Sequence, residues 1–266
     1  MLGVALVSTP RSAKLEPKRT SEVRFVALGD VHGSFAQAAK LVTAGRRSLG
    51  GKLNAVLCVG DLEANRNARD AAGVATGRGH KRWVGEFPKV LSGEIDLGAP
   101  IWFIGGDHEP WATLDSRGPG EIYPGLHFLG RAGVRDVAGL KVGFLSGIRG
   151  SASGGDLFSR MGRDERACYV EVELIALARG LERAGGVDVM ITHDWPTGML
   201  PDIGSADVRQ ILDIAQAKLH ICGHRHMRRS ELFGATNTEA LADVLAGKKG
   251  WASFVRKRSG VIERIS

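Results

Sequence analysis

The sequence predicts an α/β layered fold, and two observations lead to that prediction. Short apolar runs of strand type alternate with helical stretches over most of the 266 residues. Several of these runs end in a glycine followed by an acidic residue or a histidine, and open α/β sheets place their ligands at the carboxyl ends of strands. Because composition shows no sustained break, we expect one domain over residues 22–266. Residues 1–21, polar and basic after a short apolar start, are expected to form a flexible leader.

The first half of the chain predicts strands that alternate with helices. In chain order, the expected elements are the strand Val23–Leu28, a helix from the capping residue Ser34 to about Leu49, the strand Ala55–Val59, a helix near Trp83–Leu91 and the strand Pro100–Ile104. Glycine and aspartate follow all of these strands, at Gly29-Asp30, Gly60-Asp61 and Gly106-Asp107. We therefore expect their carboxylates to meet at one edge of a sheet.

In the second half of the chain the expected strands are short and begin with a meander, which predicts a second sheet. Its expected elements are short strands of a meander at Leu126–Leu129, Val134–Val137 and Leu140–Leu145, a long exposed loop over Arg149–Arg166, a helix from about Tyr169 to Ala184, the strand Val187–Ile191, a helix over Asp207–Ala217, the strand Leu219–Cys222, a helix over Thr238–Leu245 and edge strands at Trp251–Arg256 and Val261–Ile265. Histidines follow two of these strands, His193 in one case and the Gly-His-x-His pair His224 and His226 in the other.

Composition narrows the classes of partner and compartment. The formal net charge of +7 and the pI of about 9.6 favour an anionic partner, although solubility explains the same excess. Cys58, Cys168 and Cys222 form no CxxC pair, so neither a disulfide framework nor a zinc ribbon is indicated and a cytoplasmic location is expected. The opening Met1–Val7 lacks the basic flank of a signal peptide. No apolar run approaches the roughly 20 residues that span a bilayer, so no membrane partner is expected.

The strand ends together supply a set of side chains that suits metal ions. These side chains are Asp30, His32, Asp61, Asp107, His193, His224 and His226. Taken singly, a histidine after an apolar strand is often a core residue and Gly-Asp is an ordinary turn pair; their joint occurrence at successive strand ends favours ligation. The set exceeds what one ion needs, and imidazole with carboxylate suits Mn, Fe or Zn. Two divalent ions activate a bound water and clamp phosphoryl oxygens, which predicts hydrolysis of a phosphoester.

The order and spacing of these motifs resemble the calcineurin-like metallophosphoesterase superfamily over Val23–His226. The shared motifs are Asp-x-His-Gly, Gly-Asp, Gly-Asp-His-Glu, a later lone histidine and Gly-His-x-His. The resemblance implies a four-layer αββα sandwich with a dinuclear metal centre. By motif position, it implies a first metal held by Asp30, His32 and His226, a bridging Asp61, and a second metal held by Asp107, His193 and His224. It also places His108 beside the scissile phosphate, where the family's histidine stabilises the transition state or protonates the leaving oxygen.

Within that superfamily the chain is similar to RNA lariat debranching enzymes, which hydrolyse a 2′,5′-phosphodiester at an RNA branch point. The similar segments are residues 59–67, 103–109, 129–134, 146–148 and 193–196. Protein Ser/Thr phosphatases instead carry Asp-Arg-Gly where this chain has Ala64-Asn65-Arg66. The chain departs from the debranching pattern at Asp107, where those enzymes have Asn, and at Asp30, where many have Cys. The extra charge of Asp107 is expected to tighten metal binding and to weaken the attraction for phosphate.

Further side chains near these motifs have two interpretations each. Arg66 and Asn67 are placed to contact a substrate phosphate, or they belong to a solvated loop. The basic clusters at 78–82 and 228–229 track a nucleic-acid backbone or form solvated faces. Trp111 and Trp195 stack a base or, as their size favours, pack in the core.

Three functions are consistent with the sequence. The leading one is a two-metal phosphodiesterase acting on RNA or another nucleotide-type substrate. The first alternative is a phosphomonoesterase acting on nucleotides or small phosphorylated metabolites, because no motif sets the leaving group. The second alternative is a non-catalytic nucleic-acid-binding module, which the complete set of ligand positions and His108 disfavour.

Overall fold

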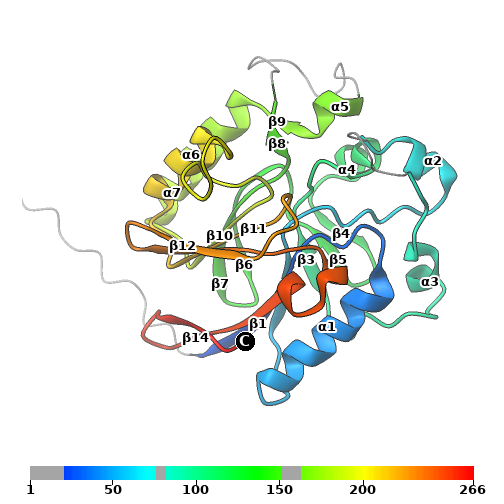
Figure 1. Ribbon diagram of the computed structural model, residues 1–266, viewed down its shortest axis with the longest axis horizontal. Coiled ribbons are helices and arrows are strands. Elements are labelled where there is room, and N and C mark those ends of the chain that lie inside the picture. The colour runs from blue at the N-terminus through cyan, green and yellow to red at the C-terminus, as the bar shows by residue number, and fades with distance from the viewer. Residues whose placement is uncertain (1–20, 76–81, 151–162) are drawn as a thin grey trace, which may run out of the picture.

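The computed structural model describes residues 21–75, 82–150 and 163–266. Two β-sheets pack face to face, and helices cover the outer face of each, as the fold prediction required (Figure 1). The elements in chain order are β1 (Val23–Leu28), α1 (Phe35–Ser48), β2 (Ala55–Cys58), α2 (Ala68–Ala72), α3 (Phe87–Leu91), β3 (Ile101–Phe103), α4 (Trp111–Arg117), β4 (Gly120–Tyr123), β5 (Leu126–Phe128), β6 (Ala132–Val137), β7 (Leu140–Leu145), β8 (Ile148–Arg149), α5 (Arg163–Arg166), β9 (Cys168–Tyr169), α6 (Glu171–Ala184), β10 (Val189–Thr192), α7 (Ala206–Ala215), β11 (Leu219–Cys222), β12 (Arg229–Phe233), β13 (Thr236–Ala240), the 3-10 helix η2 (Val244–Gly250), β14 (Trp251–Arg256) and β15 (Ile262–Arg264).

The first sheet has the strand order β15-β14-β1-β2-β3-β5-β4, and β1, β2, β3 and β5 run parallel. Strand β1 is buried on both faces because its side chains alternate between two cores. Val26 and Leu28 pack into the core beneath α1, whereas Phe25 and Ala27 pack into the core between the two sheets. Figure 1 shows α1 and α3 on the side of this sheet that faces away from α6 and α7.

The second sheet has the strand order β12-β13-β11-β10-β7-β6, in which β10 runs parallel to both β7 and β11. Its outer face is covered by α6 and α7, which contribute buried apolar side chains such as Leu177, Leu181 and Leu212. The two sheets and their helical covers form the four layers of the predicted αββα sandwich. The 3-10 helix and β14 return the chain to the first sheet, where β14 pairs antiparallel with β1.

Two expected elements lie elsewhere or have another conformation. Leu126–Leu129 was expected in the second sheet, but β5 pairs parallel with β3 in the first sheet, so only β6 and β7 form the hairpin of the meander. Thr238–Leu245 was expected to be a helix because its residues favour one, but its first part is β13. Strand β13 lies between β11 and β12, and the hydrogen bonds of both ladders outweigh local propensity.

Other expectations differ in detail or fall outside the described residues. Ser34 occupies the N-cap position of α1 without capping it, and the Glu86 carboxylate accepts the amide hydrogen of Ala36 at 2.9 Å instead. The leader up to residue 20, most of the basic cluster at 78–82 and residues 151–162 of the long loop lie outside the described ranges. Within the described ranges, no helix is both long enough and apolar enough to cross a membrane.

The topology brings the carboxyl ends of five strands to one region between the sheets. Strands β1, β2 and β3 are parallel neighbours in the first sheet, and β10 and β11 are parallel neighbours in the second. Each is followed within a few residues by one of the predicted site residues. Because parallel strands end on the same side of a sheet, residues that are far apart in the sequence meet there.

Candidate metal centre

The structure brings together all seven side chains that the strand ends predict. They fall into one group of Asp30, His32, Asp61 and His226 and a second group of Asp107, His193 and His224. In each group the ligand-type atoms lie within 4.8 Å of one another, which is the arrangement able to hold a metal ion. Asp61, Asp107 and His108 form a third such group, so Asp61 and Asp107 link the first two.

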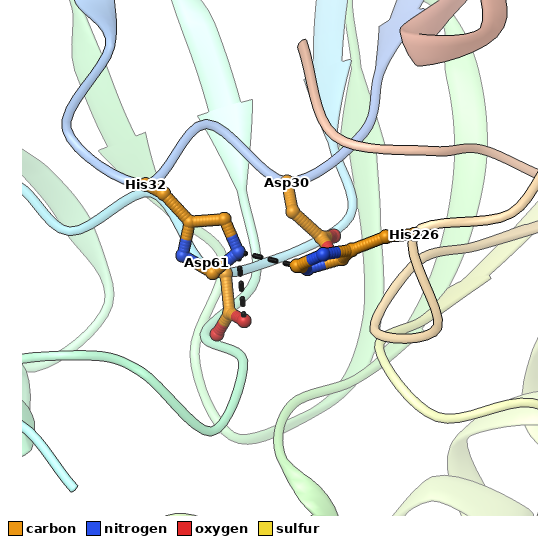
Figure 2. A group of neighbouring side chains, drawn as sticks. All are labelled: Asp30, His32, Asp61 and His226. Atoms are coloured by element: carbon orange, nitrogen blue, oxygen red, sulfur yellow. Dashed lines mark hydrogen bonds and ion pairs between the residues drawn. The ribbon is translucent and has the colours of Figure 1, made fainter. Parts of the chain in front are cut away.

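The first group, which we call the His226 group, opens toward solvent. Figure 2 shows the imidazoles of His32 and His226 turned toward one another above Asp61, with Asp30 beside His226. The two Nε2 atoms are 3.0 Å apart, and the Nε2 of His226 is 3.1 Å from Oδ2 of Asp30. The Nε2 of His32 is 3.7 Å from Oδ2 of Asp61. The side chain of His226 is 45% exposed, whereas that of Asp30 is fully buried.

The second group, which we call the His193 group, is more enclosed. His193 is fully buried, and its Nε2 lies 2.9 Å from Oδ1 of Asp107 and 3.4 Å from Oδ2 of Asp61. The Nδ1 of His224 lies 2.9 Å from the same Asp107 oxygen. The Nδ1 of His193 is 2.9 Å from the carbonyl oxygen of Val59. A carbonyl oxygen can only accept a hydrogen bond, so Nδ1–H is the donor there. The Nε2 of a neutral His193 is therefore left as the ligand atom.

Two buried carboxylate oxygens at the centre support a fit to metal ions. Oδ1 of Asp30 and Oδ2 of Asp61 have no hydrogen-bond partner among the described residues, although such atoms are costly to leave without one. The backbone also leaves no room for extra side chains around them. A Cβ on Gly223 would lie 2.2 Å from Oδ1 of Asp30, and one on Gly106 would lie 2.1 Å from Oδ1 of Asp61. The donor set and the unpartnered oxygens together match what divalent transition metals require.

The loops that present these side chains are strained. His32, Asp61, His224 and His226 all have positive φ values, between 46° and 67°, a conformation that non-glycine residues adopt only at a cost of about 1–3 kcal/mol each. Backbone hydrogen bonds tie the loops together: the amides of Val31 and His32 both donate to the carbonyl oxygen of Asp61, at 3.0 and 2.8 Å. Such strain concentrated at one place is typical of a functional site.

The charges of the centre reinforce one another. Burial opposes the charged form of His32, but the hydrogen bond with Glu63 and the carboxylates of Asp61 and Asp30 raise its pKa to about 9. Burial likewise opposes the ionised form of Asp61, yet the positive charge of His193, when that ring carries a second proton in place of a bound cation, holds the pKa of Asp61 well below its usual value. The centre therefore favours ionised carboxylates and bound positive charge, as a cation site requires.

Two buried glutamates that the sequence did not single out position the ligand loops. Oε1 of Glu63 lies 2.7 Å from Nδ1 of His32 and directs the Nε2 of that imidazole toward Asp61 and His226. Glu109 accepts the amide hydrogens of Leu62 and Glu63, at 2.7 and 3.1 Å, and holds the loop that follows Asp61. Glu109 is the last residue of the Gly-Asp-His-Glu motif and Glu63 lies two residues after Asp61, and these positions were the only signals of their role in the sequence.

Of the remaining predicted site residues, His108 contacts both groups, whereas the bonds described for Arg66 and Asn67 are to other residues. Nε2 of His108 is 3.2 Å from Oδ2 of Asp107, and its backbone amide donates to Oδ1 of Asp61 at 2.7 Å. Arg66 forms an ion pair with Asp70 at 2.6 Å. The Asn67 side chain caps α2 by accepting the amide hydrogens of Arg69 and Asp70.

The two tryptophans expected near the site support it from within the core. Trp111 and Trp195 are 1% and 0% exposed, so core packing, the favoured interpretation, is confirmed. Each indole N–H donates to the carbonyl oxygen of a glycine that precedes a predicted ligand. Trp111 bonds to Gly106 at 3.1 Å and Trp195 bonds to Gly223 at 2.5 Å.

The chain is a two-sheet sandwich with clusters of acid and imidazole side chains at its strand ends, and metal ions held by such side chains are suited to phosphoryl chemistry. Residues 23–228 match the family model of the calcineurin-like phosphoesterases, and the chain belongs to that family. The family assignment confirms the resemblance that the order and spacing of the motifs indicated.

Individual relatives agree with this assignment. The chain is 25% identical to a lariat debranching enzyme of Drosophila melanogaster over 81% of its own length, which is 45% of the fly protein. It is 23% identical to a lariat debranching enzyme of Entamoeba histolytica over 89% of its length and 73% of that protein. The chain thus spans less than half of the fly relative. Among solved structures, TT1561 of Thermus thermophilus matches with a TM-score of 0.61 and 16% identity, over 92% of this chain and 98% of the other, which shows a shared fold.

Proposed function

We propose that this protein is a phosphodiesterase that holds two divalent transition-metal ions and acts on RNA or a nucleotide-type substrate. One observation carries the proposal: two ligand groups meet at Asp61, whose Oδ2 lies 3.7 Å from Nε2 of His32 and 3.4 Å from Nε2 of His193. In this proposal Asp30, His32 and His226 hold one ion, Asp107, His193 and His224 hold the other, and Asp61 serves both. Such ions, when bound, supply an activated water and neutralise charge on the phosphoryl oxygens.

His108 is the proposed proton-handling residue. Its Nδ1 lies 2.7 Å from the carbonyl oxygen of Ala75, so Nδ1–H donates there and Nε2 is the atom turned toward Asp107. In the imidazolium form Nε2 carries a proton as well, and that proton is available to a phosphoryl oxygen or to the departing oxygen of an ester at this place. The amide of His108 bonds Asp61, which fixes the loop that carries the imidazole.

The substrate class rests on charge and on the relatives. The net charge of +7 favours a polyanion, and the relatives named above are lariat debranching enzymes, whose substrate is RNA. Arg66 and Asn67 remain proposed substrate contacts; Arg66 has to exchange its partner Asp70 for a phosphate. A cytoplasmic location is also proposed, supported by three cysteines that are all free.

The test compares two chromogenic esters. Protein stripped of metal and reloaded with Mn²⁺ is given bis(p-nitrophenyl) phosphate or p-nitrophenyl phosphate, and kcat/KM is measured for each. The proposal expects metal-dependent hydrolysis with the diester preferred. Predominant cleavage of the monoester contradicts the phosphodiesterase assignment, and the absence of hydrolysis with either ester overturns catalysis itself.

A further inference from the structure

An exposed tryptophan lies beside the His226 group. Trp83 is 45% exposed, in contrast to the buried Trp111 and Trp195. An indole ring carries a large apolar surface that a folded chain normally buries. Trp83 is therefore a large flat surface left open next to the candidate metal centre, and none of the roles described above accounts for it.

The backbone around Trp83 is hydrogen-bonded to two of the loops that carry the His226 group, those that follow β1 and β2. A Cβ placed on Gly33 would lie 3.4 Å from Cζ2 of the indole, so the ring lies against the residue that directly follows His32. The side-chain amide of Asn65, four residues after Asp61, donates to the carbonyl oxygen of Trp83 at 3.1 Å. The Glu86 amide donates to the carbonyl oxygen of Gly33 at 2.9 Å.

These contacts hold the indole in place without burying it. The hydrogen bonds that anchor this segment are made by its backbone and not by the indole ring. A small polar side chain at position 83 would therefore be compatible with the same anchoring. An aromatic face fixed beside a phosphoester site matches one chemistry in particular, which is stacking on a planar base. A base linked to the reacting phosphate has to lie within a few bonds of the centre, and Trp83 is adjacent to a predicted ligand loop.

We infer that Trp83 forms a stacking subsite for a nucleobase of the substrate, next to the His226 group. The inference rests on the proposed function and names the substrate class for that site: a phosphoester that carries a base on the side of His32. Because every base has a flat face, the subsite favours nucleotides over base-free phosphoesters without selecting one sequence.

The first test measures binding without turnover. The probes are 5′-deoxy-5′-(phosphonomethyl)adenosine, whose carbon–phosphorus bond the enzyme does not hydrolyse, and methylphosphonate, which lacks the nucleoside. Calorimetric titration of Mn²⁺-loaded protein is expected to give an affinity for the nucleoside phosphonate at least about tenfold higher. Trp83→Ala and Trp83→Leu should abolish that preference, whereas Trp83→Phe should retain most of it. Leu keeps apolar contact with Gly33 but has no flat ring, so it separates stacking from packing.

The second test measures hydrolysis with a matched pair of diesters. Thymidine 5′-(p-nitrophenyl phosphate) carries a base, and methyl p-nitrophenyl phosphate does not. Trp83→Ala is expected to raise KM about tenfold for the thymidine ester, with kcat retained, and to leave the methyl ester unchanged. Ile175→Ala, on α6 and 43% exposed, is the control and should change neither ester. Melting temperatures verify that the variants are folded.

The outcomes separate the two proposals. If wild-type protein hydrolyses the diesters and Trp83→Ala keeps the full preference for the base, the stacking subsite is overturned and the phosphodiesterase assignment stands. If wild-type protein hydrolyses neither diester and binds neither phosphonate, both are overturned.

Discussion

Among the described residues, buried carboxylates with an unpartnered oxygen occur both in the candidate metal centre and at the start of α6, and their surroundings differ between these two regions. In the candidate metal centre they include Asp30 and Asp61. At the start of α6 lies Glu173, which lines a cavity of about 740 Å³ between α4 and α6 and is 6% exposed. Oε1 of Glu173 has no hydrogen-bond partner among the described residues, while its Oε2 accepts the amide hydrogen of Val170 at 3.0 Å.

The residues around each buried carboxyl group determine whether its pKa is raised or lowered. Around Asp61 burial is outweighed by the charges of His193 and His32, which lower its pKa. Around Glu173 burial is the largest effect, and the charge of Arg131 opposes it only partly, so the pKa rises to about 7. Burial of a carboxylate alone thus yields an acid that takes up a proton near neutral pH. Burial among imidazoles that offer ring nitrogens yields an anionic ligand set.

The largest effect is expected from a substitution that removes the carboxylate shared by the two ligand groups. Asp61→Asn removes the charge that both groups share, so bound metal should fall and kcat/KM for bis(p-nitrophenyl) phosphate should drop about a thousandfold, roughly 4 kcal/mol of barrier. Metal content by plasma mass spectrometry accompanies the kinetics. Asp213→Asn, an exposed aspartate on α7, is the matched control. Full metal content in Asp61→Asn contradicts the shared role.

A smaller difference is expected between the enclosed and the open group. His193→Ala removes a fully buried imidazole and leaves the Val59 carbonyl unpaired, so we expect a loss of about a hundredfold or more in kcat/KM. His226→Ala affects a side chain that is 45% exposed, where water replaces the imidazole, and about a tenfold loss is expected. Equal losses in the two variants, with equal metal content, would count against this distinction.

Substitutions of Asp107 test how much negative charge the centre needs to bind metal ions. Its Oδ1 contacts both His193 and His224, and the side-chain oxygen of Asn fits the same place. Asp107→Asn should weaken metal binding, because one charge is lost, and should keep or raise turnover of a phosphodiester at saturating Mn²⁺. A loss of turnover greater than about tenfold, roughly 1.4 kcal/mol of barrier, contradicts this expectation. Asp107→Ala, which lacks the oxygen, serves as the comparison.

The prediction for Glu173 concerns no loss of activity and is visible only in stability against pH. Its pKa in the folded protein is about 7, above the ordinary value of 4.5, so the folded state binds the proton more tightly than the unfolded state. The corresponding stability is fully present below about pH 4.5 and is lost as pH rises through 7, with a slope of up to about 1.4 kcal/mol per pH unit. Urea unfolding at pH 5, 6, 7 and 8 measures it. Glu173→Gln should flatten that part of the profile, and an unchanged profile contradicts the raised pKa.

Local pattern predicted most strands but not their partners. Val23–Leu28 and Leu219–Cys222 agree with β1 and β11 to the residue, because continuous apolar runs between polar ends leave little choice. Thr238–Leu245 was mistaken for a helix because local propensity does not show that β13 pairs with β12 on one side and with β11 on the other. Leu126–Leu129 was placed in the wrong sheet for the same reason, because a short apolar run does not specify which strand pairs with it.

The chemical identity of the candidate centre was determined by the sequence alone. Asp and His side chains at the ends of successive apolar strands are a local property, and parallel strands in one sheet have to end together. Only the tertiary structure decided which side chains surround each ligand. It placed Glu63 against His32, buried Trp111 and Trp195 behind the ligand loops and left Trp83 exposed beside Gly33. Burial and hydrogen-bond partners arise from contacts between segments far apart in the chain, and sequence spacing does not specify them.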